Sequence, residues 1–224
     1  MNTNTNKLTI IVGHYGSGKS EFSVNYAEYI SQLGEVHLAD LDIVNPYFRS
    51  RELRETLIKK GIVMVSDTLN STKGLDMPYL SPAIKGQIAN QTNRMILDCG
   101  GDDVGIRVLK QFIPQIKSRD YEIWMIINTF RPETSDVNQI QIMKDKLELE
   151  LGLKVTHYIH NSNFLRHTTV DEMIAADQLM KEVSELTNIP IKYVSGIKSL
   201  IDQLPNDVSG ERFVMELLLR NDWM

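Results

Sequence analysis

The chain has 224 residues, of which 42% are hydrophobic and 24% are charged, and its formal net charge is −5. This length and composition allow a large buried core, and the negative charge gives no overall basic footprint for nucleic acid. The single cysteine excludes an internal disulfide, and no apolar run approaches transmembrane length. We therefore expect a cytoplasmic protein without membrane insertion and without a nucleic-acid partner.

The N-terminal part of the chain predicts a strand, a glycine-rich turn and a helix. Residues 1–6 are polar and are expected to form a flexible tail, and the apolar run 8–12 predicts a buried strand. Apolar residues at helical spacing predict a helix over about 19–33. Between them lies a match to G-x-x-x-x-G-K-[ST], the phosphate-binding loop. Its residues are Gly13, His14, Tyr15, Gly16, Ser17, Gly18, Lys19 and Ser20.

This loop predicts a site for the phosphates of a nucleotide. Backbone N–H groups of such a loop point inward and form an anion nest, and the helix that follows adds its positive N-terminal end. Glycine allows positive φ and close approach of the phosphates. We expect Lys19 to reach the β- and γ-phosphates and the hydroxyl of Ser20 to coordinate Mg²⁺.

The rest of the chain alternates between predicted strands and helices. We expect strands at 36–39, 62–65, 95–97, 123–127, 155–159 and 191–194, the last being the final strand. Helices are expected at 50–60, 81–89, from about 104, 135–151 and 169–186. A C-terminal helix is expected to place Phe213, Val214, Leu217 and Leu218 on its inner face.

This alternation predicts an α/β fold in three layers, in which helices cover both faces of a mostly parallel sheet. With no internal repeat or linker, residues 7–224 are expected to form a single domain. Ligands of such sheets bind at the carboxyl ends of the strands. Polar residues end several predicted strands: Asp40, Asp42, Asp98, Asn128 and Asn161.

The acidic residues at these strand ends indicate a magnesium site. Asp98 follows an apolar strand, where a carboxylate that holds Mg²⁺ is expected. Gly101 follows closely, and its N–H is a candidate contact for the γ-phosphate. Asp40 and Asp42 are two residues apart, so an extended backbone would turn both toward the metal. One would support Mg²⁺ and the other would orient water; the alternative is a turn capped by aspartate.

The asparagines are candidates for contact with a nucleobase. Asn128 and Asn161 each carry an amide that can both donate to and accept from the edge of a base. We favour Asn161 for this contact.

Taken together, these residues resemble the MinD/ParA/CobQ/CobB-type P-loop ATPases, the group that includes the nitrogenase iron protein. The resemblance rests on the loop at 13–20, the D-x-D at 40–42, Asp98 with Gly100 and Gly101, and the strand end at 160–162. It implies the P-loop NTPase fold and an ATPase whose two subunits sandwich the nucleotide. It also implies Lys19 and Ser20 on phosphate and Mg²⁺, Asp42 in water activation, Asp98 on Mg²⁺ and Asn161 on adenine.

The sequence departs from that family inside the loop. Many members carry a second lysine directly after the first glycine, which reaches across the dimer, whereas this chain has His14 there and Tyr15 in place of a glycine. His14, Arg49 or Arg51 are candidates to replace that charge. The cysteines of the nitrogenase branch and the basic membrane helix of the MinD branch are absent from the sequence.

The sequence therefore predicts a Mg²⁺-dependent ATP-binding protein and slow ATPase that acts as a nucleotide-switched regulatory or assembly factor. A nucleotide-dependent homodimer and a further protein partner are expected. The alternative is a small-molecule kinase or ATP-dependent ligase of the same superfamily, with an acceptor pocket from residues 67–93 and 102–107. A GTPase is disfavoured because no N-K-x-D motif for guanine occurs.

Overall fold

The computed structural model describes residues 7–42, 54–65, 82–101 and 103–219. Across these residues, eight parallel strands form one sheet in the order β3-β2-β4-β1-β5-β6-β7-β8. The strands are β1 (Leu8–Gly13), β2 (Val36–Asp40), β3 (Ile62–Val65), β4 (Arg94–Asp98), β5 (Tyr121–Ile127), β6 (His157–His160), β7 (Ile191–Ile197) and β8 (Glu211–Met215).

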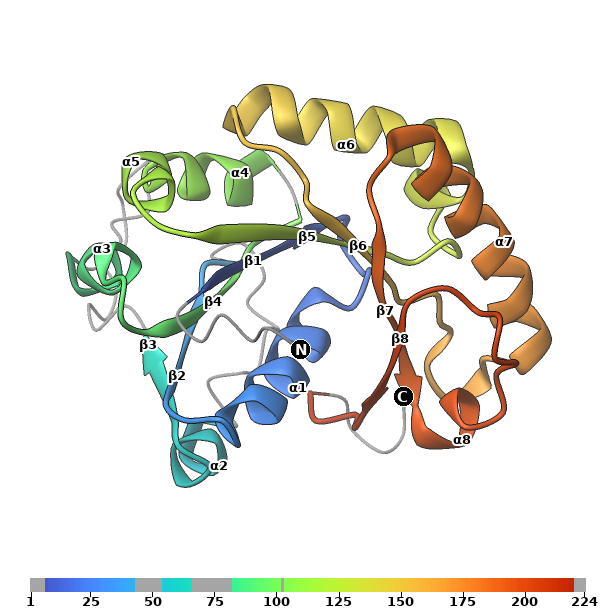
Figure 1. The fold of residues 1–224 in the computed structure, drawn as a ribbon, viewed down its shortest axis with the longest axis horizontal. Helices are drawn as coiled ribbons and strands as arrows, with labels where there is room; N and C mark the ends of the chain where they lie inside the picture. The colour runs from blue at the N-terminus through green and yellow to red at the C-terminus, as the bar shows by residue number, and fades with distance from the viewer. Residues whose placement is uncertain (1–6, 43–53, 66–81, 102, 220–224) are drawn as a thin grey trace.

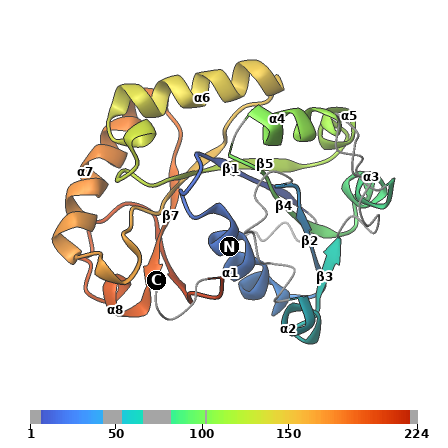
Figure 2. The same ribbon diagram turned by 180° about the vertical axis from the view of Figure 1, so that it is seen from behind.

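Helices cover both faces of this sheet (Figures 1 and 2). On one face lie α1 (Lys19–Ser31) and α2 (Arg54–Lys59). The opposite face is covered by α3 (Pro82–Ala89), α4 (Asp103–Lys110), α5 (Ile113–Lys117), α6 (Val137–Leu151) and α7 (Val170–Thr187). The short α8 (Lys198–Ile201) contacts β7 and β8. The α/β fold with helices on both faces of the sheet is thus confirmed.

The central strand shows why this sequence forms a three-layer structure. All six residues of β1 are buried, as expected of a strand covered on both faces. Alternate side chains enter different cores: Leu8 and Ile10 join the cluster under α3–α7, and Ile11 joins the cluster under α1 and α2. The predicted phosphate-binding loop follows directly from this fully buried strand, which fixes its position.

The predicted C-terminal helix is wrong, because residues 211–215 form strand β8. Phe213 and Met215 are buried whereas Arg212 and Val214 are exposed, which is the two-residue period of a strand. The ring of Phe213 lies 5.1 Å from that of Phe22 on α1 and 5.4 Å from that of Tyr193 on β7. Pairing with β7 and these aromatic contacts therefore outweigh the local helical spacing, and β7 is not the final strand.

Several predicted boundaries shift. Helix α2 begins at Arg54 within the described residues, β5 begins at Tyr121, and β7 continues to Ile197. The five-residue α5 was not predicted, since it is too short to show a clear helical period. The predicted tail at 1–6, and Arg49 and Arg51, lie outside the residues that the structure describes.

Candidate functional site

The sheet brings the predicted phosphate loop and two aspartates to one edge. In the parallel register, Asp98 of β4 stands opposite Ile11 of β1 on one side and Asp40 of β2 on the other. The ladder continues one step past β2, where the N–H of Leu41 donates to the carbonyl of Asp98 over 2.8 Å. The carboxyl ends of three adjacent strands therefore converge beside the loop.

The loop adopts a conformation that depends on glycine. Gly13, Gly16 and Gly18 have φ values of 144°, 75° and 88°, in the region that other residues avoid. A Cβ atom on Gly13 would lie 2.4 Å from the carbonyl oxygen of Ile126, and one on Gly18 would lie 2.3 Å from Nδ2 of Asn161. Gly13 and Gly18 are therefore required for two reasons: the positive φ of the turn, and the lack of room for a Cβ atom beside Ile126 and Asn161.

Helix α1 begins at this loop, and its N-cap residue is a glycine, which has no side chain to cap the helix. Its N-cap residue is Gly18, in the left-handed region. Glu21, the acidic residue of the first turn, accepts instead from the backbone N–H groups of Leu218 and Leu219. The first N–H groups of the helix and the positive end of its dipole make this terminus suited to an anion.

Lys19 is buried and folded back onto the loop. Its ammonium donates to the carbonyl of His14 over 2.9 Å. Gly101 lies directly against this contact, since a Cβ there would be 2.8 Å from Nζ of Lys19 and 2.6 Å from the backbone nitrogen of Tyr15. Only glycine allows such an approach, so Gly101 is placed where it can respond to a change at Lys19. The predicted roles of both residues toward phosphate stay predictions.

Asp98 has the environment expected of a ligand for a cation. It is 1% exposed, and Ser23, one turn beyond Ser20, donates to its Oδ1 over 3.1 Å. Burial raises the pKa of Asp98 to about 6, against the opposing effects of Ser20, Lys19 and Ser23. Its Oδ2 is buried and makes no hydrogen bond of good geometry within the described residues. A buried carboxylate oxygen of this kind fits the outer coordination of Mg²⁺.

The two aspartates after β2 differ in their surroundings. The backbone N–H of Asp42 donates to Oδ1 of Asp40 over 3.0 Å, which is the aspartate-capped turn that the sequence left as an alternative. Strand β2 ends at Asp40, and Asp42 lies beyond it. Asp42 is near enough to raise the pKa of Asp98. The metal role of Asp40 and the water-activating role of Asp42 stay predictions.

Asn161 connects β6 and β7 to the loop. Its Nδ2 donates to the carbonyl of Ser17 over 2.8 Å, and its Oδ1 accepts from the hydroxyl of Ser195 over 3.0 Å. Because the side chain is almost fully buried, both ends of this amide are engaged within the protein. Asn128 is engaged in the same way, since its Oδ1 accepts from Phe130 and Asn163. For Asn161 to contact adenine as predicted, its amide would have to give up its hydrogen bond to Ser17 or to Ser195.

Residues that follow β5 contact the outer side of the loop, and the sequence did not indicate these contacts. Nε of Arg131 donates to the carbonyl of Gly16 over 3.1 Å. Nδ1 of His14 lies 2.9 Å from the carbonyl of Tyr15 and 3.5 Å from Oε2 of Glu133. Arg131 and Glu133 follow β5, more than 110 positions further along the chain, and no local motif marks them. Ser23 could have been found, since it lies one helical turn after Ser20.

Across the described ranges, no three His, Cys, Asp or Glu side chains form a metal-binding group of their own. This is compatible with a Mg²⁺ ion that draws most of its ligands from phosphates and water. Of the helices described, none has both the length and the apolar character to cross a membrane.

Comparison with known proteins supports the fold. No family model and no curated protein sequence matches the chain. Among solved structures, the cell division protein FtsY of Thermotoga maritima is similar with a TM-score of 0.58 and 19% identity over 88% of this chain and 65% of that one. The signal recognition particle receptor FtsY of Elizabethkingia anophelis, in complex with GDP, has a TM-score of 0.58 and 14% identity, over 92% and 62%.

A third structure matches more of its own length. It is a nucleotide-binding protein of Archaeoglobus fulgidus in complex with ADP, with a TM-score of 0.52 and 13% identity over 88% of this chain and 84% of that one. The chain spans less than two thirds of the FtsY structures reported above. At these identities the likeness concerns the fold, and this chain has the P-loop NTPase fold.

Proposed function

We propose that this protein binds ATP with Mg²⁺, hydrolyses it slowly, and acts as a nucleotide-switched regulatory or assembly factor. The observation that carries the proposal is the position of the N-terminus of α1, which starts from a glycine loop and lies beside the buried carboxylate of Asp98. This arrangement would place an anion site, the N-terminus of α1, next to a cation site, Asp98, at the same edge of the sheet. The proposal includes membership of the MinD/ParA-like branch of P-loop ATPases, a nucleotide-dependent homodimer, a further protein partner and a cytoplasmic location.

The positions of the residues support the following roles in this proposal. The loop N–H groups and Lys19 would hold the β- and γ-phosphates, and Ser20 with Asp98 would hold Mg²⁺, which neutralises charge on the phosphates. Asp40 is a further candidate for support of the metal. Asp42 would orient the attacking water. Gly101 would meet the γ-phosphate through its N–H, so that loss of this phosphate alters its contact with Lys19.

The choice of ATP over GTP is also part of the proposal. The chain lacks an N-K-x-D motif, and Asn161 directly follows β6, at the edge where a base would be read. The similar structures hold different nucleotides: the Archaeoglobus protein is in complex with ADP and the Elizabethkingia FtsY with GDP. A direct comparison of ATP and GTP binding by calorimetry tests this choice, and tighter binding of GTP would overturn it.

Two substitutions test the division of labour at the site. Lys19→Ala removes the charge expected on the β- and γ-phosphates and should abolish tight ATP binding. Asp42→Ala should leave ATP affinity within about twofold and reduce kcat by about a hundredfold or more, because it removes an interaction made mainly in the transition state. Calorimetry with a non-hydrolysable analogue and phosphate release measure the two effects. Equal loss of binding in both variants contradicts the assignment.

The alternative function is phosphate transfer to a small molecule. A hollow beside the loop, lined in part by Gly105 and Ile106, favours it. These two residues belong to the 102–107 segment expected to contribute to an acceptor pocket. Transfer of ³²P from labelled ATP to a metabolite extract, analysed by chromatography, tests this alternative. A labelled organic product formed faster than free phosphate would favour the kinase over the switch.

A further inference from the structure

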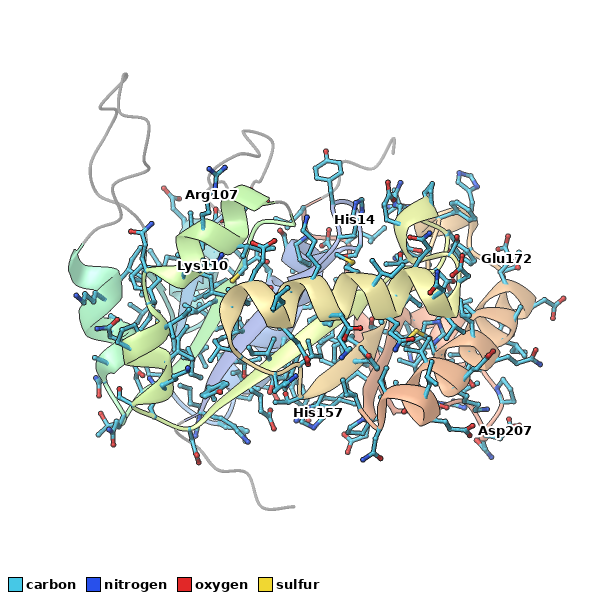
Figure 3. All side chains as sticks on the ribbon, turned by 90° about the horizontal axis from the view of Figure 1, so that it is seen from above. His14, Arg107, Lys110, His157, Glu172 and Asp207 are labelled. Atoms are coloured by element: carbon cyan, nitrogen blue, oxygen red, sulfur yellow. The ribbon has the colours of Figure 1, made fainter. Side chains whose placement is uncertain are left out.

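The outer side of α6 carries apolar residues where a surface helix is expected to be polar. Its inner side enters the core through Ile140, Leu147 and Leu151. On the outer side, Ile142 is 53% exposed and Leu149 is 86% exposed, more than any other large apolar residue that the structure describes. A helix at the surface normally keeps its apolar residues for the inner stripe. Figure 3 shows α6 across the front of the molecule, with no described segment in front of it.

The exposed residues of α6 form one line along the helix. Ile142 and Leu149 are seven positions apart, and Asp145 and Lys146 lie between them on the same side. Both charged residues are exposed. We call these four residues the α6 stripe. Ile142 and Lys146 also reach the rim of the hollow beside the loop, whereas Asp145 and Leu149 lie outside its lining, so the stripe is a surface of its own.

The α6 stripe is complementary to itself. Its order is apolar, acidic, basic, apolar. If a second copy lies antiparallel across it, with a two-fold axis between positions 145 and 146, Ile142 faces the partner's Leu149 and Asp145 faces the partner's Lys146. The axis repeats each pair, so every contact forms twice. A parallel arrangement would instead set like charges opposite each other, which costs free energy. The pattern of charge therefore favours an antiparallel second copy.

The contacts that these charged residues make within their own chain are compatible with this pairing. Oδ1 of Asp145 lies 2.6 Å from Nζ of Lys144, and Lys146 also interacts within its own chain. Neither contact has to break, because a carboxylate has two oxygens and an ammonium has three donors. Exposed ion pairs add little affinity. Ile142 and Leu149 would therefore supply most of the attraction, while the charges set the orientation.

We propose that the α6 stripe is a docking surface for a second copy of this chain, bound antiparallel through α6 of both copies. Helix α6 has 15 residues and is about 22 Å long. Two such helices bury an area at the low end of specific complexes, so the dimer is weak, with a Kd of about 100 μM. This dimer does not rest on the proposed function, because it needs no nucleotide.

Sedimentation equilibrium of the nucleotide-free full chain, from about 10 to 500 μM, measures the association. We expect a reversible equilibrium between monomer and dimer. Leu149→Ala should weaken it by about tenfold or more, since each copy loses apolar contact area. A chain that stays monomeric over this range would leave the stripe to a different protein and overturns the proposal.

Leu33→Ala is the matched control. Leu33 is 55% exposed and follows α1, on the other face of the sheet. The same change of side chain there should leave the dimer unchanged. Because Leu33 and Leu149 are both exposed, both variants should fold, which circular dichroism and thermal melting check. Equal weakening in the two variants overturns the location.

Two charge variants test the pairing of Asp145 with Lys146. Lys146→Glu sets an acid opposite the partner's Asp145, and Asp145→Lys sets a base opposite the partner's Lys146. Each variant alone should associate about fivefold more weakly than wild type at low salt. An equimolar mixture restores opposite charges at both pairs and should return to within about twofold of the wild-type Kd. A mixture that associates no better than either variant alone overturns the pairing.

Cross-linking tests the antiparallel orientation. Ile142→Cys and Leu149→Cys are treated with a short bismaleimide, each alone and as a mixture. The antiparallel arrangement predicts cross-linked dimers in the mixture and few in either variant alone. The native Cys99 is buried, so wild type should not react. Cross-links within each variant alone, with no gain on mixing, would indicate a parallel pair and overturn the arrangement.

The α6 dimer and the nucleotide-dependent homodimer of the proposed function are separable. Leu149→Ala should leave ATP binding unchanged, together with any association that appears only with ATP. Association that requires ATP and survives Leu149→Ala, with none in the nucleotide-free chain, would support the proposed function and overturn the α6 dimer. Nucleotide-free association that Leu149→Ala weakens, in a chain that binds no ATP, would have the opposite meaning.

Discussion

The N-termini of α1 and α7 differ in how their backbone N–H groups are satisfied. In α7, Thr169 and Glu172 form a reciprocal capping box: the Thr169 N–H donates to Oε2 of Glu172 over 2.8 Å, and the Glu172 N–H donates to Oγ1 of Thr169 over 3.3 Å. In α1, the N-cap is Gly18, which has no side chain to cap the helix. Helix α7 is therefore capped by its own residues, whereas α1 starts from a glycine loop that has no such capping box.

The first-turn acids of the two helices sharpen this contrast. Glu172 turns back to its own helix start, and that contact lowers the pKa of its carboxyl. Glu21 in α1 is instead directed to the backbone of Leu218 and Leu219, beyond β8. A negative charge at the start of α1 would repel a phosphate. The fold thus uses an acidic residue in the first turn of both helices but removes it from the anion site in one.

The largest effect should come from a side chain at the start of α1. Gly18→Ala introduces a Cβ at φ 88°, 2.3 Å from Nδ2 of Asn161, so the loop and Asn161 must move apart. We expect ATP affinity to fall by about a hundredfold and stability by about 1–3 kcal/mol. Calorimetry and urea unfolding measure these changes.

Gly152→Ala is the control for backbone strain. Gly152 also has positive φ, at 61°, but a Cβ there meets no described atom within 4 Å. It should cost about 1 kcal/mol of stability and leave ATP affinity unchanged. If Gly18→Ala binds ATP as tightly as Gly152→Ala does, the loop is not the phosphate site.

Asn161 supports the loop that precedes α1, and its substitution separates two roles: holding this loop in place and contacting adenine. Asn161→Ala removes the donor to the Ser17 carbonyl and the acceptor for Ser195. We expect stability to fall by about 1–3 kcal/mol, since a buried hydroxyl and a buried carbonyl lose a partner. ATP affinity should fall by about tenfold, and any preference for ATP over GTP should disappear.

The measurement is calorimetric titration of wild type and variant with both nucleotides. A proportional loss for ATP and GTP, with the preference retained, would mean that Asn161 holds the loop and does not read adenine.

Acid should lower the free energy of unfolding through His160, a buried histidine that lies beside α7. Burial lowers the pKa of His160 to about 4, although Asp177 of α7, with its carboxylate 3.9 Å away, acts in the opposite direction. Asp177 is also bound by Lys181 over 2.9 Å. The unfolded chain has the ordinary histidine pKa near 6.5 and so binds more protons between pH 6.5 and 4. The contribution of His160 to stability is therefore present above pH 6.5 and falls as the pH drops toward 4.

Urea unfolding at several pH values measures this dependence. His160→Gln, which cannot be protonated, should show a flatter decline over the same range. An identical slope in the variant and the wild type would contradict the role assigned to His160.

The smallest effect should come from the capped helix. Thr169→Ala removes the side-chain part of the capping box and should cost about 1 kcal/mol of stability, with ATP binding and hydrolysis unchanged. Thermal unfolding and phosphate release check both parts. A marked loss of ATP binding in this variant would mean that the two helix starts are not independent, and the contrast between them would not hold.

The sequence by itself determined the strand–glycine loop–helix at the N-terminal side, the alternating strands and helices, the strand ends at Asp40 and Asp98, and the position of Asn161 just after a strand. These features depend on residues close together along the chain: apolar runs, glycine spacing and polar residues that end a run. Helices 137–151 and 170–187 were predicted nearly to their ends, as 135–151 and 169–186, because apolar spacing is a local signal; the structure adds that Asp136 and Thr169 cap their starts and that Gly152 and Asn188 end them.

Only the tertiary structure decided features that depend on distant segments. Residues 211–215 form a strand because β7 offers a free edge and Phe213 enters the aromatic cluster around Phe22, which no local period reveals. Likewise, the bond of Asn161 to Ser17 joins residues 144 positions apart, and that of Arg131 to Gly16 joins residues 115 apart. The sequence marks where a phosphate can bind, whereas long-range packing determines which side chains hold that loop in place.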